Sequence, residues 1–315
     1  MDNLTSVTEF LLMGFSDLRQ LQVAHFVLFL AIYLGALAGN FLIISTVIQN
    51  QHLHSPMYFF LVNLSFLDAG YISTTVPKSM ANSVMNEKRI SYSGCVSQVF
   101  LVILFAGTEL ALLTVMAYDR YVAICSPLRY GLIMNWKACF QMATASWLSG
   151  AINAALCTAN TFSLHFCSSR FINQFFCDIP QLISISCSDT RLVIWEVFAS
   201  ALLASFGFVS VIVSYGNIFS AVLKIQSVQA RHKTFSTCTP HLTVFSLFLS
   251  TALFSYFRPK SWSSPAVDLL SAVLYTVLPP LMNPVIYCLR NREIKATLSK
   301  ITRKRERERG RTMTS

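Results

Sequence analysis

The chain has 315 residues, of which 54% are hydrophobic and only 12% are charged. A soluble globular domain carries about 25% charged residues, so this composition excludes a disordered chain and argues against an ordinary soluble fold. The formal net charge is +10, and 10 of the 24 basic residues fall between positions 290 and 311.

Seven apolar stretches follow one another along the chain, each long enough to cross a bilayer as a helix, which takes about 20 residues. A transmembrane β-barrel would instead show alternating segments of about ten residues. The sequence therefore predicts an all-α bundle of seven transmembrane helices over residues 25–289, between a terminus of residues 1–24 and a basic tail of residues 290–315. The stretches are 25–48, 57–79, 96–118, 138–160, 193–223, 237–257 and 267–289.

Three observations favour an extracellular N-terminus. That orientation places 16 Lys and Arg residues inside and 8 outside, in agreement with the positive-inside rule, although the C-terminal tail supplies the whole excess. Asn3-Leu-Thr5 is a glycosylation sequon, which is modified only on the lumenal side. Cys167, Cys177 and Cys187 fall between the fourth and fifth stretches, and disulfides persist in oxidising compartments.

Polar residues inside the stretches predict an internal polar core, because lipid cannot satisfy their hydrogen bonds. They are Asn40 in the first stretch, Asp68 in the second, and Asn283 and Tyr287 in the seventh. Pro284 frees a carbonyl one turn earlier and bends the seventh helix. Each residue alone could simply hold helices together; as a set, they favour a core that can rearrange.

Glu109 is a second acid within the membrane. With Asp68 it could hold a cation, sodium being favoured, or the two could share a proton, because like charges at close range cannot both ionise. The alternative is one protonated acid that only hydrogen-bonds a neighbour. No other cofactor is expected, and sodium would act as an allosteric modulator.

No enzyme motif occurs in the chain. The six histidines are scattered, and no phosphate loop or nucleophile elbow is present. Cys157, Cys167, Cys177 and Cys187 are almost regularly spaced, but Cys157 lies within the fourth stretch, so disulfides explain the series better than zinc. We therefore expect a protein that is not an enzyme and has no nucleic-acid partner.

Asp119-Arg120-Tyr121 stands where the third stretch meets its polar flank. A charge costs about 2.5–3.5 kcal/mol at a helix centre and less near the interface, so charges retained there usually function at the membrane face. The predicted topology puts this face in the cytoplasm.

The tail begins with a short amphipathic segment that carries Ile294, Leu298 and Ile301. A basic run over residues 303–311 follows. Such a run beside a membrane usually contacts anionic lipid, at about 1 kcal/mol per base near the surface.

Six sequence blocks resemble the olfactory receptors, a branch of the rhodopsin-like G-protein-coupled receptors, and the resemblance runs from about residue 3 to residue 300. The blocks are Leu53–Leu61, Met116–Cys125, Ser214-Tyr215, Lys233–Cys238, Pro280–Tyr287 and Leu289-Arg290-Asn291.

The resemblance implies a receptor of the plasma membrane, expected in olfactory cilia, that binds small volatile odorants. It would activate a stimulatory heterotrimeric G protein and so raise cyclic AMP. It also implies the disulfides Cys95–Cys177 and Cys167–Cys187, and a resting state in which Asp119 holds Arg120. The implied coupling and switch residues are Asp119, Arg120, Tyr121, Tyr215, His241, Asn283, Pro284 and Tyr287.

By the same resemblance, the odorant site lies in the outer half of the third, fifth, sixth and seventh helices. The lining would be apolar with a few hydroxyls, as suits a small ligand with one oxygen function. Tyr256 would offer both a ring face and a hydrogen bond. The projected residues are Val102, Ile103, Ala106, Gly107, Ser200, Leu203, Ala204, Leu253, Tyr256 and Thr276.

Two departures from the family pattern concern the sixth helix. Phe248-Leu249-Ser250 stands where Phe-Tyr-Gly is usual, and Pro240 replaces a usual Ser before His241. A related receptor for an internal metabolite shares every motif. An ion-coupled transporter is the alternative from another class, and only Asp68 and Glu109 support it.

Overall fold

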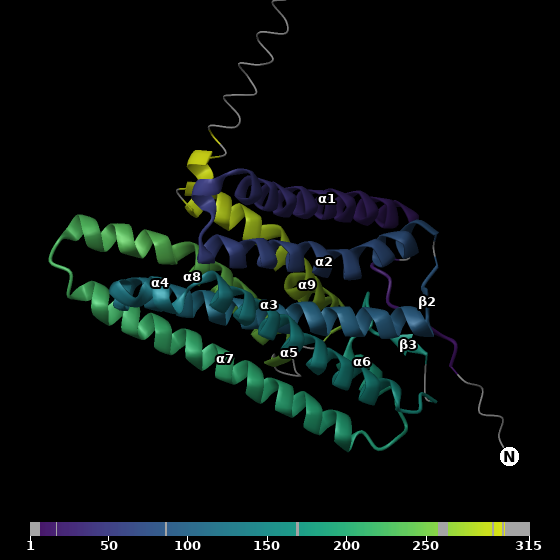
Figure 1. The fold of residues 1–315 in the computed structure, drawn as a ribbon. Helices are drawn as coiled ribbons and strands as arrows, with labels where there is room; N and C mark the ends of the chain where they lie inside the picture. The colour runs from purple at the N-terminus through teal and green to yellow at the C-terminus, as the bar shows by residue number, and fades with distance from the viewer. Residues whose placement is uncertain are drawn as a thin grey trace, which may run out of the picture.

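The computed structural model describes residues 7–16, 18–85, 87–167, 170–257, 264–291, 293–297 and 299, and for residues 256, 257 and 265 it describes the backbone alone. Seven long helices run side by side through this part of the chain (Figure 1). They are α1 (Arg19–Gln49), α2 (Pro56–Met85), α3 (Tyr92–Cys125), α5 (Trp136–Phe162), α7 (Arg191–Leu223), α8 (Val228–Phe257) and α9 (Pro265–Arg290). The predicted seven-helix bundle is thus confirmed.

Each long helix contains one predicted apolar stretch and extends it at one or both ends. Helix α3 continues to Cys125 rather than residue 118, and α8 begins at Val228 rather than residue 237. Backbone hydrogen bonding carries the helices past the point where their side chains become polar. An apolar run therefore locates the membrane-embedded part of a helix and underestimates the length of the whole helix.

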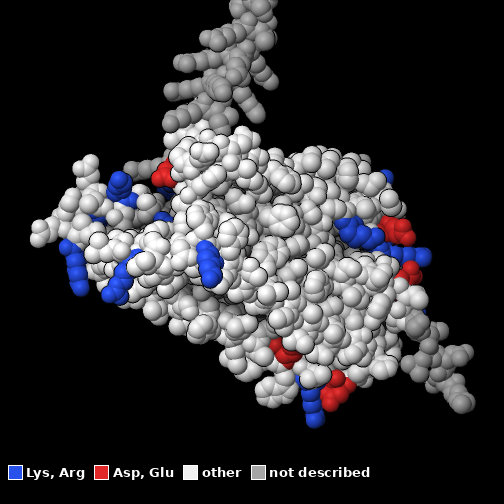
Figure 2. Space-filling view, in the orientation of Figure 1, with Lys and Arg blue, Asp and Glu red and all other residues white. Residues whose placement is uncertain are grey.

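Six of the long helices are apolar enough to cross a membrane by length and composition, and α5 is the exception. Its 27 residues suffice for a span, but several Ser, Thr and Asn residues lower its mean hydropathy. Figure 2 shows charged side chains gathered at the two ends of the molecule, with a broad uncharged belt between them. This distribution suits a bundle that crosses a bilayer.

The two ends of the bundle differ in structure, and we name them by their contents. At one end, here the sheet end, β1 (Glu9–Leu12) pairs antiparallel with β2 (Arg89–Ser91) and parallel with β3 (Phe171–Ile172). The other end, here the Arg120 end, holds the short elements η1 (Gln51–Leu53), η2 (Pro127–Arg129) and α4 (Tyr130–Ile133) (Figure 1).

The sequence predicts no sheet at this end, because it identifies residues 1–24 only as a terminus ahead of the helical stretches. Phe10 and Leu12 of β1 are buried and pack with the disulfide-bonded Cys95 and Cys177. The N-terminal segment is therefore part of the fold at this end.

Two close helix contacts depend on glycine. A Cβ atom at Gly150 of α5 would lie 3.2 Å from the carbonyl oxygen of Leu104 and closer still to Thr108 of α3. A Cβ atom at Gly39 of α1 would lie 2.9 Å from the Pro284 ring of α9. Larger residues at either position would push the helices apart.

Beyond α9, residues 293–297 are helical. Ile294 is fully buried in the main hydrophobic core, as an amphipathic segment requires. Leu298, Ile301 and the basic run over 303–311 lie outside the described residues.

Candidate functional site

At the Arg120 end, Asp119 and Arg120 form an ion pair inside the helix bundle. Arg120 Nε donates to Asp119 Oδ2 at 2.9 Å, and the guanidinium makes a second contact with the same oxygen. The hydroxyl of Tyr130 donates to the other carboxylate oxygen at 2.7 Å. Burial and the Asp119 carboxylate raise the pKa of Tyr130 above its usual value, so the phenol keeps its proton. Sequence reasoning missed Tyr130, whose position eleven residues after Asp119 gave no periodic signal.

His241 of α8 connects three helices deeper in the bundle. Its Nε2 lies 3.0 Å from the carbonyl oxygen of Leu113 in α3, and its Nδ1 lies 2.8 Å from the hydroxyl of Tyr215 in α7. Because a carbonyl only accepts, the neutral ring carries its proton on Nε2 and accepts from Tyr215. One buried imidazole thus connects α7 and α8 to α3, the helix that carries the ion pair.

Asn283 of α9 lies between the two membrane acids. Its amide nitrogen is 3.0 and 3.1 Å from the Asp68 carboxylate oxygens and 3.4 Å from Glu109 Oε1. All three side chains are buried, and within the described residues Asn283 Oδ1 has no hydrogen-bond partner. Two carboxylates and an amide oxygen are the hard donors that a sodium ion would take, and the donor set equally fits a shared proton.

The carbonyl that Pro284 frees has a partner. Proline has no N–H to donate to the Pro280 carbonyl one turn earlier. Asn40 Nδ2 of α1 donates to that oxygen at 2.9 Å and to the Ala36 carbonyl at 3.0 Å. The predicted inward polar contact of Asn40 therefore exists, and it joins α1 to the proline-containing part of α9.

The remaining switch residues are placed as follows. Tyr287 is fully buried, and its hydroxyl has no partner within the described part of the chain. Tyr121 is half-buried and packs against the main core. Helix α8 continues on both sides of Pro240, and Leu249 packs against the same core.

Both implied disulfides are formed. Cys95 of α3 is bonded to Cys177, with Cα atoms 5.6 Å apart, and Cys167 is bonded to Cys187, with Cα atoms 6.1 Å apart. Cys157 is a buried free thiol in α5. Within the described residues, no three His, Cys, Asp or Glu side chains gather as a metal site would need.

Several residues projected to the odorant site do lie between helices near the sheet end. Val102 is buried, and Ala106 packs against the same aromatic cluster. The Thr276 hydroxyl is buried and donates to the Ala272 carbonyl at 2.7 Å. The Ser200 hydroxyl donates to Asn153 Oδ1 of α5 at 2.7 Å. Ile103 and Ala204 are partly buried, and odorant contact by any of these residues stays a prediction.

Three of the projected residues point elsewhere. Leu203 and Leu253 are 60% and 46% exposed, so they do not face an enclosed interior site. Gly107 faces α5, where its Cβ position lies 3.9 Å from the Gly150 Cα atom. The direction in which each residue faces depends on how its helix is rotated against the neighbouring helices. Helical spacing in a single sequence does not specify that rotation. The side chain of Tyr256 lies outside the described residues.

Two loop residues that sequence reasoning missed fill the space beside Val102. Phe175 and Phe176, here the aromatic plug, are buried against Tyr71, Ala272 and Tyr275, among other residues. The rings of Phe176 and Tyr275 lie 6.0 Å apart in an edge-to-face arrangement. Their position directly before Cys177 was the available signal, since the Cys95 disulfide brings this loop over the bundle.

Hydrogen bonds hold the plug on either side. The backbone N–H of Cys177 donates to Gln98 Oε1 of α3 at 2.8 Å, and Gln174 Nε2 donates to the Asp268 carbonyl of α9 at 3.1 Å. The loop is therefore tied to α3 and α9 at residues that flank the two rings.

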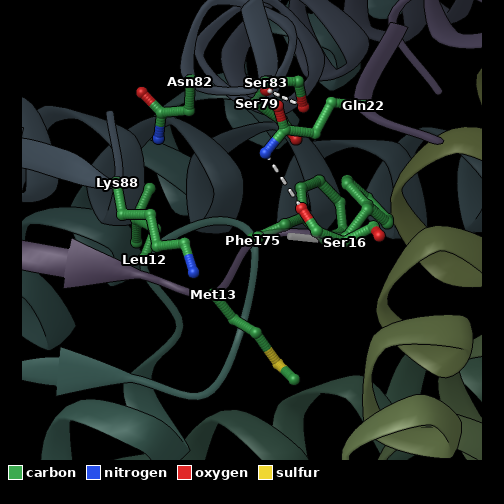
Figure 3. Close-up of a pocket in the computed structure, with 11 residues that line it drawn as sticks. Leu12, Met13, Ser16, Gln22, Ser79, Asn82, Ser83, Lys88 and Phe175 are labelled. Atoms are coloured by element: carbon green, nitrogen blue, oxygen red, sulfur yellow. Dashed lines mark hydrogen bonds between the residues drawn. The ribbon is translucent and has the colours of Figure 1, made fainter. Parts of the chain in front are cut away.

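A small cavity lies on the other side of Phe175, between the N-terminal segment, α1 and α2 (Figure 3). Gln22 crosses it to donate to the Ser16 carbonyl at 3.1 Å. None of the nine projected odorant-site residues whose side chains the structure describes lines this cavity. Phe175 thus separates it from the cluster that contains Val102 and Phe176.

A family model described as olfactory receptor matches residues 29–305. Human olfactory receptor 14A16 is 51% identical over 299 residues, covering 95% of this chain and 96% of that protein. Human olfactory receptor 14I1 is 52% identical over the same length and coverage. The chain belongs to the olfactory receptor family.

The fold of this olfactory receptor is also that of a solved relative. The crystal structure of squid rhodopsin matches with a TM-score of 0.64 and 16% identity, covering 90% of this chain and 81% of that one. At this identity the likeness shows the fold alone. The receptor is therefore a multi-pass membrane protein and a G-protein-coupled receptor, and its family implies odorant ligands and coupling to a G protein.

Proposed function

We propose that this olfactory receptor binds a small volatile odorant between α3, α7, α8 and α9 and activates a stimulatory heterotrimeric G protein, which raises cyclic AMP. In this proposal the sheet end faces outside and the Arg120 end faces the cytosol, in the plasma membrane of olfactory cilia. The observation that carries it is the closed ion pair of Asp119 and Arg120, held by Tyr130 in a member of this receptor family.

The ion pair supports a resting state that a G protein could open. Within the described part of the chain, Asp119 is the carboxylate partner of Arg120, and Tyr130 donates to the second oxygen of Asp119. An outward movement of α8 would separate His241 from the Leu113 carbonyl and from Tyr215. Tyr215 and the unpartnered hydroxyl of Tyr287 would then be available to Arg120. An odorant drives this change only as far as it binds the opened form more tightly than the closed one.

The chemistry near the predicted odorant site favours a particular ligand class. Ser200 and Thr276 both give their hydroxyl protons to protein oxygens, so each offers an acceptor to a ligand. The surroundings are otherwise apolar and, at Phe176 and Tyr275, aromatic. A small alcohol, which can donate, would satisfy these groups better than an ether of the same size.

The test is a panel of odorants in a cyclic-AMP reporter cell, followed by Arg120→Ala at matched surface expression. We expect the agonist response to disappear in Arg120→Ala and to persist in Lys137→Ala, which removes an exposed base at the same end. Odorant-driven ion flux that needs no G protein would contradict the proposal and favour a transporter.

Sodium as an allosteric modulator is part of the same proposal. Asp68, Glu109 and the free oxygen of Asn283 would hold the ion and, with it, the closed arrangement of α2, α3 and α9. Replacing sodium with N-methylglucamine should increase agonist potency in the wild type and leave Asp68→Asn unchanged. Equal potency of the wild type in both media would favour the shared proton.

A further inference from the structure

A cluster of polar side chains lies between α5 and α7 near the sheet end, and it contains the projected odorant residue Ser200. The Asn160 amide nitrogen of α5 donates to Glu196 Oε2 of α7 at 2.9 Å. One turn further along α7, the Ser200 hydroxyl donates to Asn153 Oδ1 of α5 at 2.7 Å, and its oxygen lies 3.7 Å from the Cys157 sulfur. We name these five side chains the α5–α7 cluster.

Glu196 lies on the face of α7 that turns toward the bundle. Val193 is buried, and Glu196 and Ser200, which follow it at helical spacing, are half-buried. Trp195 and Phe198, on the other side of the helix, are exposed. Large apolar side chains at the perimeter of a membrane-spanning bundle contact lipid. The Glu196 carboxylate is therefore directed away from lipid and toward α5.

The Glu196 carboxylate has no basic partner. Within the described part of the chain it forms no salt bridge with a Lys, Arg or His side chain, and its Oε1 accepts no hydrogen bond. Glu9 and Asp119, by contrast, lie beside Arg89 and Arg120. A partly desolvated carboxylate is destabilising unless a cation or further hydrogen bonds compensate it. The position therefore favours a cation that a ligand supplies.

The groups that α7 offers to a ligand in this cluster are hydrogen-bond acceptors. Ser200 gives its proton to Asn153, so its oxygen can only accept from a further partner. Asn160 occupies one oxygen of Glu196 and leaves the other. Residues four apart on a helix are separated by a rise of about 6 Å. Because each N–H···O bond spans about 2.8 Å, one nitrogen between Glu196 and Ser200 can donate to both.

This arrangement discriminates between ligands by charge and by the number of donors. A primary ammonium group has a positive charge and three N–H donors, a hydroxyl group has one donor, and an ether has none. A ligand carboxylate would meet the like charge of Glu196. Ala204, one turn beyond Ser200, is small and half-buried, so an alkyl chain can pass it. The cluster therefore suits an ammonium group at the end of an apolar chain.

We propose that the α5–α7 cluster binds the ammonium group of an aliphatic primary amine, and that Glu196 makes the receptor prefer such amines to alcohols of equal length. Glu196 Oε1 and Ser200 Oγ accept from the ammonium group, while Asn160 and Asn153 hold these two side chains in place. The alkyl chain runs past Ala204 into the bundle. The inference rests on the proposed function, because it uses the same odorant site, and it narrows the ligand class.

The test compares primary amines from butylamine to decylamine with the alcohols of equal chain length in the cyclic-AMP reporter cell. Such amines are cations at neutral pH, as the Lys side chain is. We expect the best amine to be more potent than its matched alcohol in the wild type. Glu196→Gln keeps an oxygen for Asn160 but removes the charge, so it should weaken the amine about tenfold and change the alcohol less than about twofold. Glu87→Gln, at an exposed acid of the same end, should change neither.

Two further variants separate contact with the ligand from support of the fold. Ser200→Ala should weaken the amine and the alcohol alike, because both donate to this oxygen. Asn160→Leu leaves the Glu196 charge but removes the side chain that holds it, so it should weaken the amine severalfold and spare the alcohol. This second variant also covers the case in which Glu196→Gln reaches the cell surface poorly.

An equal shift of amine and alcohol in Glu196→Gln at matched surface expression would overturn the inference, because Glu196 would then act through the fold. An unchanged amine response in that variant would overturn it as well. Activation by alcohols without any active amine would overturn the inference and leave the proposed function standing. Failure of every odorant class to raise cyclic AMP would contradict the proposed function, and the inference with it.

Discussion

Inside the Arg120 end, charged and polar side chains bond to one another, whereas inside the sheet end the buried polar side chains Gln98 and Gln174 bond to backbone and aromatic rings fill the space. Asp119 has two side-chain partners, Arg120 and Tyr130, each of which can leave without unfolding a helix. Gln98 bonds the backbone of the disulfide-bonded Cys177, and Phe176 is packed on all sides. The comparison indicates that side-chain contacts at the Arg120 end can rearrange while the helices stay folded, whereas the disulfide and the packed rings keep the sheet end rigid.

The largest expected effect comes from removing the Cys95–Cys177 disulfide at the sheet end. Cys177→Ser removes a disulfide that closes a sequence separation of 82 residues, and such losses typically cost about 2–5 kcal/mol. We expect surface expression to fall severely. Flow cytometry of a tagged receptor measures it, with Cys157→Ser, which replaces a free buried thiol, as the control expected to reach the surface. Normal expression of Cys177→Ser would mean that the sheet and the plug hold this end without the bond.

The next-largest effect tests whether a substitution at the sheet end can change odorant response without changing basal signalling at the Arg120 end. Phe176→Ala removes a fully buried ring, at about 3–5 kcal/mol for such truncations, and leaves space beside Val102 and Tyr275. Thermal stability should fall, and the surviving receptor should respond to larger odorants while its basal cyclic AMP stays low.

Phe198→Ala is the matched control, because that ring is exposed on α7. If Phe176→Ala instead raised basal signalling as much as a substitution at Arg120, the two ends would not be separable in the way that the contacts suggest.

The sequence predicts the Arg120 end better than it predicts the sheet end. The long helices followed from apolar runs because helix hydrogen bonds are local, and Asp119 and His241 followed from short motifs. The sheet could not be predicted, since its strands have four, three and two residues and pair across about 80 positions (β1 with β2) and 160 positions (β1 with β3) of the chain. Leu203 shows the same limit in the odorant site, because it is exposed beside the partly buried Ala204.

A smaller effect tests how much the Tyr130 hydrogen bond contributes to the resting state of the Arg120 end. Tyr130→Phe removes one hydrogen bond to a carboxylate, worth about 1.5–3 kcal/mol when the acceptor is charged. Asp119 then holds Arg120 without its second partner, so basal cyclic AMP should rise severalfold at matched expression. Tyr118→Phe changes an exposed hydroxyl on the same helix and should leave basal cyclic AMP unchanged. Unchanged signalling in Tyr130→Phe would show that the ion pair alone holds the resting state.

The smallest effect concerns an acid at the sheet end, Asp178, for which the described residues supply no side-chain partner like those of Asp119. Burial raises the pKa of Asp178, next to the disulfide-bonded Cys177, to about 6, against about 3.9 in an unfolded chain. Between these values the folded receptor binds more protons than the unfolded one, so its stability falls as pH rises from about 4 to about 6. Above that range, Asp178→Asn should be the more stable protein, by about 1 kcal/mol, since partial exposure weakens the effect.

Thermal unfolding in nanodiscs from pH 4 to pH 8 measures this difference between Asp178→Asn and wild type. The gain should vanish near pH 4, where Asp178 is protonated in the folded receptor and the substitution changes no charge. Asp189→Asn, at a mostly exposed acid in the same loop, should show no such pH dependence. A gain that persisted at pH 4 would trace to packing of the amide and not to the buried charge. A loss at pH 8 would mean that the carboxylate has a stabilising partner, and the sheet end would then resemble the Arg120 end more than its other contacts indicate.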